Sequence, residues 1–151
     1  VPTLSFRVGN ERGNAIVEAV VRVSLVRTER TAEGMTFYRL VDITLSRDRS
    51  PAVARSWTVM HPITKGSPLF GKTPGDLARE EIELIVTLVG VDDTSLQPVH
   101  ARKTYVDGDF RWGARHADIL EEHPDGSIVL DVRKFHDLIP TTPTEDFPYP
   151  Q

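Results

Sequence analysis

Three features that many small domains rely on are missing from this sequence: cysteine, long apolar runs and an excess of basic residues. With no cysteine among 151 residues, disulfides, cysteine-bound zinc and thiol nucleophiles are excluded. The apolar runs, such as residues 84–86, last only a few residues, whereas a membrane-spanning helix needs about eighteen. The formal net charge of −4 argues against a nucleic-acid partner, which would require a basic surface.

What is present suffices for one folded domain. Hydrophobic residues make up 39% of the chain and charged residues 26%, a balance that supports a core and argues against disorder. Prolines at positions 140, 143, 148 and 150 indicate that the end of the chain is extended. We therefore expect a domain over residues 1–139 and a proline-rich tail over 140–151.

Hydrophobicity with a period of two dominates the domain, as in half-buried β-strands. Between residues 15 and 28 the odd positions, from Val17 to Leu25, form one apolar face. After a turn at 31–34 the alternation resumes over residues 35–45, so these two segments are predicted to pair as a hairpin. Shorter segments indicate further strands, at 57–61, 82–90, 99–106, 119–120 and 127–132, the last two joined by a turn at 124–126.

One helix signal accompanies these strands. Thr73 stands in the N-cap position, Pro74 in the first helical position, and the acidic Asp76 three residues after the cap, which predicts a helix of two to three turns. Many short strands with turns between them and one short helix predict an all-β fold. The expected architecture is an immunoglobulin-like antiparallel β-sandwich, with an open single sheet as the alternative.

Signals for catalysis are weak. Residues 66–73, Gly-Ser-Pro-Leu-Phe-Gly-Lys-Thr, satisfy the phosphate-loop pattern, in which backbone N–H groups surround a phosphate at a helix N-terminus. That loop needs a parallel sheet with crossover helices, and Pro68 removes one N–H group, so a nucleotide enzyme is kept only as an alternative. The five histidines show no metal-ligand spacing and no serine lies in a nucleophile elbow. No enzyme activity, metal site or cofactor is expected.

Two polar features stand out within the strands. Glu18 lies in the middle of a predicted strand, with Ile16 and Val20 expected on the same face. Because charged residues are seldom buried, the pattern alone favours a solvent-facing Glu18. Residues 92–95, Asp-Asp-Thr-Ser, follow Gly90 and are interpreted as a polar loop.

Short segments along the chain, in order and with compatible spacing, resemble the cytoplasmic domain of inward-rectifier potassium channels, the bacterial branch in particular. They are Phe6–Asn10, Ile16–Ala19, Ser67–Leu69, Ala101–Arg102 with Tyr105, and Trp112–Gly113. The resemblance runs from about Leu4 to about Leu138. It implies a regulatory domain at the cytoplasmic face of the cell membrane, attached to its own transmembrane pore domain. Four copies would surround the ion path, and the domain alone would neither select nor conduct potassium.

The resemblance also assigns roles to residues. Glu18 falls on the family's rectification-linked glutamate, which fourfold symmetry turns into a ring facing potassium, magnesium or a polyamine in transit, and Asp48 matches a further acidic pore position. A narrow pore focuses such a field. The family's gating loop maps onto residues 90–99, with Val91 and Leu96 as an apolar constriction. Its members here are Gly90, Val91, Thr94, Ser95 and Leu96.

Further positions bear on bracing, lipid contact and rectification. Asp93 and Arg102 match a charged pair that braces the gating loop, within or between subunits. Arg12 occupies a position near the membrane that is basic in the family, which implies contact with anionic headgroups of the inner leaflet. Lipid-activated relatives have a lysine at the next position, where this chain has Gly13. Strongly rectifying relatives carry an acidic residue where this chain has Val89. A free-standing immunoglobulin-like interaction module is the alternative, since the same sandwich serves many functions.

Overall fold

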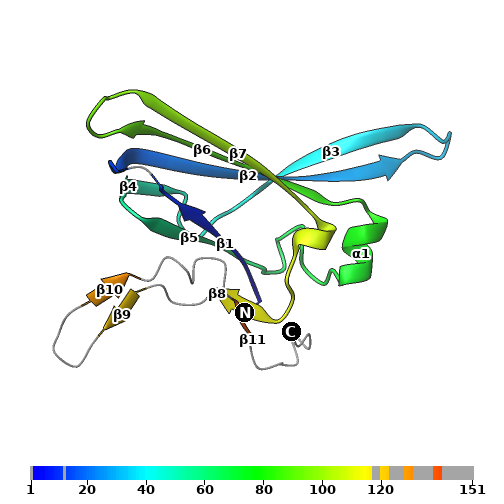
Figure 1. The fold of residues 1–151 in the computed structure, drawn as a ribbon. Helices are drawn as coiled ribbons and strands as arrows, with labels where there is room; N and C mark the ends of the chain where they lie inside the picture. Colours follow the sequence, from blue (N-terminus) through cyan, green and yellow to red (C-terminus); the bar gives the residue numbers. More distant parts are fainter. Residues whose placement is uncertain (1, 12, 117–119, 123–127, 131–137, 141–151) are drawn as a thin grey trace.

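The computed structural model describes residues 2–11, 13–116, 120–122, 128–130 and 138–140, which form antiparallel strands with one short helix (Figure 1). The strands are β1 (Thr3–Gly9), β2 (Ile16–Arg30), β3 (Thr36–Ile43), β4 (Arg49–Val53), β5 (Ser56–Pro62), β6 (Glu83–Asp92), β7 (Pro98–Val106), β8 (Ala114–His116), β9 (Leu120–Glu122), β10 (Ile128–Leu130) and β11 (Leu138–Pro140). Helix α1 spans Pro74–Arg79 and the 3-10 turn η1 spans Asp107–Asp109. The predicted all-β class is confirmed.

Strand β2 organises the larger of the sheets. It has 15 residues and pairs with β3, β4 and β6, and β7 continues the sheet beyond β6. Strands β1 and β5 form a second antiparallel layer below it, while β8 pairs with β11 and β9 with β10 (Figure 1). The far end of the β2–β3 hairpin extends beyond the second layer as an arm, at the right of Figure 1.

The core lies between the two layers and under the helix. Its buried side chains come from alternate positions of β2 and β6, from β1 and β5, and from the segment around α1; they are Phe6, Val21, Val23, Leu25, Ile43, Val59, Leu69, Leu77, Ile82, Leu84, Val86 and Leu88. Fully burying one such side chain stabilises the fold by about 1.5–3 kcal/mol. A smaller cluster of Ile16, Ala19 and Val53 lies at the start of β2, with Trp57 packed against both clusters.

The helix begins as predicted but is shorter. The Asp76 N–H donates to Thr73 Oγ1 and the Thr73 N–H donates to Asp76 Oδ2, which completes a capping box. The helix ends at Arg79 because Glu81 adopts a positive φ of 52°, and the Ile82 N–H then donates to the Leu77 carbonyl. This Schellman arrangement buries Leu77 and Ile82 together and stops the helix at six residues.

The predicted β2–β3 hairpin is present, and Gly34 adopts the positive φ of 83° that its turn requires. The predicted strands near 120 and 130 are β9 and β10, and they pair with each other. The turn predicted at 124–126 and the tail after Pro140 lie outside the described residues. Strands β1, β4, β8 and β11 were not expected.

Candidate functional site

Strand β2 carries a β-bulge at Glu18. Val17 pairs with Val91 and Val20 pairs with Val89, so two residues of β2, Glu18 and Ala19, oppose the single residue Gly90 of β6. Glu18 adopts a φ of 53°, a left-handed conformation that is uncommon for residues other than glycine. Its side chain is exposed. A bulge of this kind turns a side chain away from the direction that regular alternation would give it.

Because of the bulge, the buried residues at the start of β2 differ from those predicted. Ile16 is buried and Val17 is only half-buried, whereas the odd-position pattern placed Val17 in the apolar face. Glu18 is exposed and therefore does not share a face with Ile16, contrary to the expectation. The extra residue changes the parity of the strand, so the buried positions are even before the bulge and odd from Ala19 onward.

Gly90 lies where β6 passes the bulge at close range. A Cβ atom on Gly90 would lie 2.5 Å from Ile16 Cγ2 and 3.2 Å from the Val17 carbonyl oxygen. Both distances are shorter than ordinary carbon contacts, and the second is to backbone. Glycine is thus required at position 90 by packing, and the bulge and the glycine form one structural unit.

Half of the segment predicted as a gating loop is strand. Gly90 and Val91 belong to β6, and the turn to β7 contains only residues 93–97. Thr94, Ser95 and Leu96 lie in this turn, and the Leu96 side chain is 72% exposed. Val91 lies beside the bulge as the partner of Val17, so the two apolar residues of the expected constriction occupy a strand and a turn tip.

The charged residues of the prediction are distributed around this unit. Asp48 is exposed and directly precedes β4, and its carbonyl accepts from the Val21 N–H, which holds it beside β2. Asp93 lies in the turn, where its carboxylate accepts from the Thr94 hydroxyl, while Arg102 lies along β7 opposite Thr87. Among the ion pairs of the described residues, none joins Asp93 to Arg102 within one chain.

Asp92 is a residue that the sequence interpretation missed. It was grouped with the polar loop 92–95, yet it is the last residue of β6 and is fully buried. Its Oδ1 accepts from the backbone N–H groups of Thr94 and Ser95 at 2.9 Å each. An aspartate followed by small polar residues is the usual signal for this type of side-chain-capped turn.

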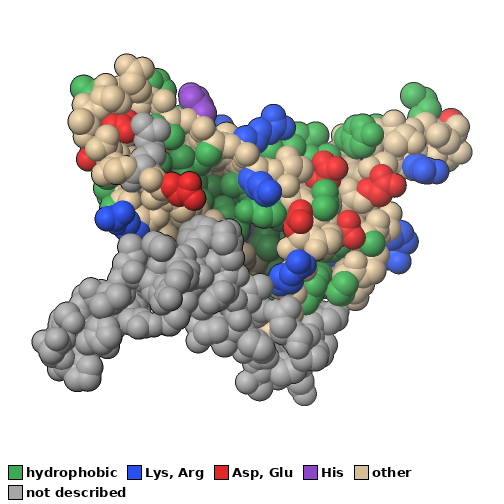
Figure 2. Space-filling view, in the orientation of Figure 1, with side chains coloured by type: hydrophobic (Ala, Val, Ile, Leu, Met, Phe, Trp, Pro, Cys, Tyr) green, Lys and Arg blue, Asp and Glu red, His purple; other side chains and the backbone are tan. Residues whose placement is uncertain are grey.

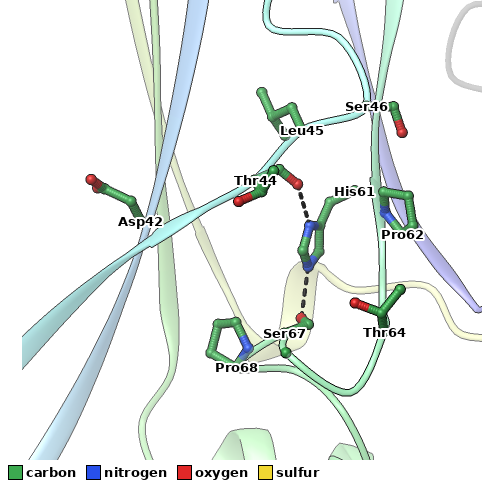
Figure 3. Close-up of a pocket in the computed structure, with 10 residues that line it drawn as sticks. Asp42, Thr44, Leu45, Ser46, His61, Pro62, Thr64, Ser67 and Pro68 are labelled. Carbon is green, nitrogen blue, oxygen red and sulfur yellow. Dashed lines mark hydrogen bonds between the residues drawn. The ribbon is translucent and has the colours of Figure 1, made fainter.

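A separate pocket of about 410 Å³ lies between the end of β3, the end of β5 and residues 64–68 (Figure 3). Its wall contains the buried His61, whose Nδ1 lies 2.6 Å from the Thr44 carbonyl and whose Nε2 lies 2.7 Å from Ser67 Oγ. Because a carbonyl only accepts, Nδ1 carries the hydrogen, and in the neutral ring Nε2 accepts from the Ser67 hydroxyl. His61 thus ties three segments together.

This pocket has no catalytic triad among the described residues. The Thr44 carbonyl occupies the place on His61 that a carboxylate would need, and Asp42 on the pocket wall accepts instead from the Ser24 hydroxyl at 3.1 Å. The Leu69 N–H donates to Ser67 Oγ, which further fixes the serine in its turn.

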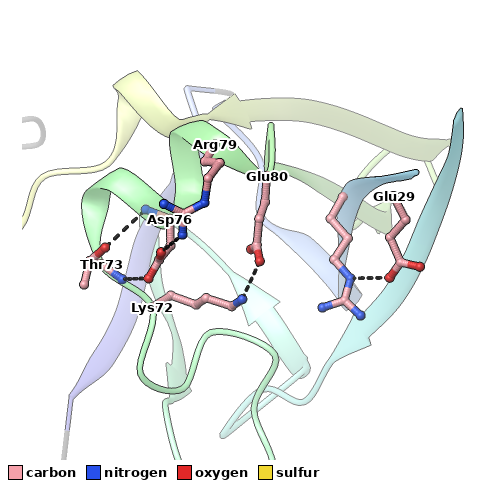
Figure 4. Close-up of polar contacts among 7 residues, drawn as sticks. Glu29, Lys72, Thr73, Asp76, Arg79 and Glu80 are labelled. Carbon is pink, nitrogen blue, oxygen red and sulfur yellow. Dashed lines mark hydrogen bonds and ion pairs between the residues drawn. The ribbon is translucent and has the colours of Figure 1, made fainter. Parts of the chain in front are cut away.

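The phosphate-loop alternative is not supported by the contacts of residues 66–73. The N–H groups of Phe70 and Lys72 donate to backbone carbonyls, and Lys72 Nζ lies 2.6 Å from Glu80 Oε1 (Figure 4). The Thr73 hydroxyl is engaged in the helix cap, and its backbone N–H lowers the pKa of the Asp76 carboxyl by donating to it. Several of the groups that would bind a phosphate, including the Lys72 ammonium and the Thr73 hydroxyl, are therefore already engaged. No cluster of acidic residues and histidines that could hold a metal occurs in the part of the chain that is described.

Comparison with known proteins decides between the remaining interpretations. A sequence model of the inward rectifier potassium channel C-terminal domain matches residues 3–147. The chain belongs to this family. It is 43% identical over 137 residues to the inward rectifier potassium channel Kirbac3.1 of Paramagnetospirillum magnetotacticum, an alignment that covers 91% of this chain and 46% of that protein.

Animal channels of the same family are also similar. Identity is 32% over 146 residues with the ATP-sensitive inward rectifier potassium channel 12 of Mus musculus, covering 93% of this chain and 34% of the relative. It is 31% over 144 residues with the G protein-activated inward rectifier potassium channel 2 of Pongo abelii, covering 92% and 34%. The chain spans less than half the length of these relatives, which are named as channels and not as enzymes. The resemblance to inward-rectifier channels is confirmed.

Arg12, the position assigned to lipid contact, lies outside the described residues.

Proposed function

We propose that this chain forms the cytoplasmic domain of an inward-rectifier potassium channel, in which four copies line an ion vestibule below the membrane pore. Membership of the C-terminal domain family supports the proposal. The observation that carries it is the bulge, which gives β2 an exposed carboxylate at Glu18 in a strained backbone conformation. Strain of this kind costs about 1–3 kcal/mol and is concentrated at functional sites.

A ring of four Glu18 carboxylates would attract cations in transit, namely potassium, magnesium or polyamines. One unit charge about 8 Å from another contributes only about 0.5 kcal/mol in water, so a single carboxylate has little effect. Four such attractions sum to about 2 kcal/mol for a monovalent cation and more for a polyvalent one. Asp48, held beside β2 by the Val21 N–H, would extend the acidic lining. No cofactor is needed for this role.

The arm of the β2–β3 hairpin supports assembly with further copies of the chain. Met35, Tyr38 and Leu40 on the arm are exposed by 64–69%, and Figure 2 shows hydrophobic side chains at the projecting end beside charged ones. The ion pairs of Glu29 with Arg27 and Arg39 stiffen the arm. Exposed apolar side chains on a stiff projection are suited to contact with a neighbouring subunit.

The turn at 93–97 would serve as the gating element in this assembly. Leu96 is presented to solvent at its tip, and a ring of such apolar side chains can close an ion path by excluding water. The proposed brace between Asp93 and Arg102 would then join neighbouring subunits, because the two residues are not paired within one chain among the described ion pairs. Contact of Arg12 with anionic lipid of the inner leaflet is a further part of the proposal and rests on the family resemblance.

Internal block in the full-length channel tests the role of Glu18. Replacing Glu18→Gln keeps the size of the side chain and removes four charges from the tetramer. We expect the concentrations of internal magnesium and spermine that give half-block to rise at least about tenfold, because the unscreened Coulomb estimate of about 2 kcal/mol already corresponds to about thirtyfold for a monovalent cation. The measurement is current block in excised patches at several voltages.

Glu33→Gln is the matched control, since Glu33 is an exposed glutamate in the turn at the end of the arm. It changes the net charge by the same amount and should leave block within about twofold, because charges farther apart than about 10 Å are largely screened at moderate salt. Unchanged block in Glu18→Gln, or an equal change in both variants, would contradict the assignment of Glu18 to the ion path.

A further inference from the structure

Asp92 is a buried carboxylate next to an exposed turn. Its exposed fraction is 0%, whereas all residues of the turn 93–97 are exposed. Burying a carboxylate is costly unless hydrogen-bond donors replace its water. Here Oδ1 accepts from the N–H groups of Thr94 and Ser95, both at 2.9 Å. The side chain therefore holds the first half of the turn by its backbone.

The backbone of Asp92 closes the rest of the turn. Its carbonyl accepts from the Leu96 N–H and its own N–H donates to the Gln97 carbonyl, each at 2.9 Å. Leu96 has a φ of 58°, an unfavourable conformation for leucine that persists only where surrounding contacts enforce it. Asp92 holds Leu96 directly through its backbone carbonyl and holds the two preceding residues through its side chain, and the Leu96 side chain is exposed to solvent.

The same turn is tied to the connection between β1 and β2. Asn14 Nδ2 lies 3.5 Å from Asp92 Oδ1, and the Asp93 N–H donates to the Ala15 carbonyl at 3.1 Å. The connection is itself held to β4, because the buried Asn10 donates through Nδ2 to the carbonyls of Asn14 and Val53, each at 2.9 Å. A continuous set of hydrogen bonds thus runs from β4 to the turn.

We infer that Asp92 is a positioning residue that sets the conformation of the turn 93–97 and couples it to the β1–β2 connection, immediately before the Glu18 bulge. Its effect on gating rests on the proposed function, in which this turn is the gate. The hydrogen bonds themselves do not depend on that function. The two statements can therefore be tested by separate readouts.

Hydrogen exchange on the full-length protein tests the positioning role. Asp92→Ala should make the amides of Thr94 and Ser95 exchange about tenfold faster or more, because both lose the Oδ1 acceptor. The Leu96 amide should change less, because the backbone carbonyl that accepts from it remains in the variant. Asp92→Asn, which keeps one acceptor oxygen, should lie between the wild type and Asp92→Ala. Exchange in the core strand β2 should not change in either variant. Exchange within twofold of wild type at both Thr94 and Ser95 in Asp92→Ala would overturn the inference.

Two further variants isolate the coupling. Thr94→Ala is the matched control in the same turn, since its hydroxyl donates to Asp93 and its backbone N–H remains available to Asp92. It should leave exchange at 95–96 within twofold. Asn14→Ala should accelerate exchange of the turn a few-fold in the wild-type background and add nothing in the Asp92→Ala background, because neighbours in one network are not additive. Full additivity would refute the coupling. If Asp92→Ala fails to fold, exchange of the turn in Asn14→Ala alone still tests whether the turn is coupled to the β1–β2 connection.

The open probability of the same variants separates the inference from the proposed function. Faster exchange together with altered open probability in Asp92→Ala supports both. Faster exchange with unaltered gating supports the positioning role and refutes the turn as the gate. Unaltered exchange refutes the positioning role and leaves the assignment of the vestibule to be judged by the block of Glu18→Gln.

Discussion

Strand β2 is built in two different ways along its length. From Val21 to Leu25 it alternates strictly, pairs in register with β6 throughout and with β3 from Val23 onward, and buries every second side chain in the main core. At its start it contains a bulge, an exposed glutamate with a positive φ and a neighbour that must be glycine. The regular part supplies stability, and the irregular part uses some of that stability to present a charge. Function is expected at the irregular end.

Removing a core side chain from the regular part should have the largest effect. Leu25 is 1% exposed within the main cluster, so Leu25→Ala should lower the free energy of unfolding by about 2–5 kcal/mol through lost burial and a cavity. Leu40→Ala, on the exposed arm, is the control and should change it by about 0.5 kcal/mol or less in the isolated subunit. Urea denaturation followed by tryptophan fluorescence measures both. A loss below about 1 kcal/mol for Leu25→Ala would show that the regular part does not carry the stability.

A methyl group added at the irregular end should have the next largest effect. Gly90→Ala places a Cβ against Ile16 Cγ2 and the Val17 carbonyl, and should cost about 1–3 kcal/mol of unfolding free energy, as other overpacked sites do. Gly66→Ala is the control, because no atom lies within 4 Å of the position of its Cβ. It should be neutral or slightly stabilising. Equal effects of the two substitutions would mean that β6 and the bulge are not in close contact.

The regular part of the molecule is also the part that sequence reasoning predicted. Alternation locates β2 and β6 because each buries every second side chain over much of its length, so the residue order itself shows which face is buried. Strands β3 and β7 are also where alternation predicted them, although most of their residues are exposed. Strand β4 contains Pro51 and has no clear alternation, and its place is set by pairing with β2. The helix start was predictable because its cap is local.

The irregular part could be predicted only in its residue types. The family resemblance singled out Glu18 and Gly90, but periodicity gave no sign of the bulge, because Ile16 and Val17 are both apolar and either parity fits. The buried Asp92 carboxylate also accepts from Asn14, which is 78 residues distant in the chain. Contacts of this kind arise from tertiary structure, and no local pattern encodes them.

The smallest expected effect is a difference in stability between glycine and glutamine variants, which should have opposite signs in the two parts of β2. At Arg22, an exposed position in the regular part, Arg22→Gly should be less stable than Arg22→Gln by about 0.5–1 kcal/mol, since glycine loses more backbone entropy on folding. At Glu18 the left-handed conformation costs other residues about 1–2 kcal/mol that glycine avoids, so Glu18→Gly should equal or exceed Glu18→Gln in stability.

Both substitutions at each position remove the same charge, so the comparison reports the backbone alone. Unfolding free energies of the four variants, measured under one set of conditions, give the two differences directly. If the glycine variant is less stable than the glutamine variant at both positions, the backbone of β2 is not strained at Glu18. The exposed carboxylate then has no conformational cost that a function would have to justify. If the sign reverses only at Glu18, the strain is local to the bulge, and the fold spends stability at the residue proposed to meet the cation.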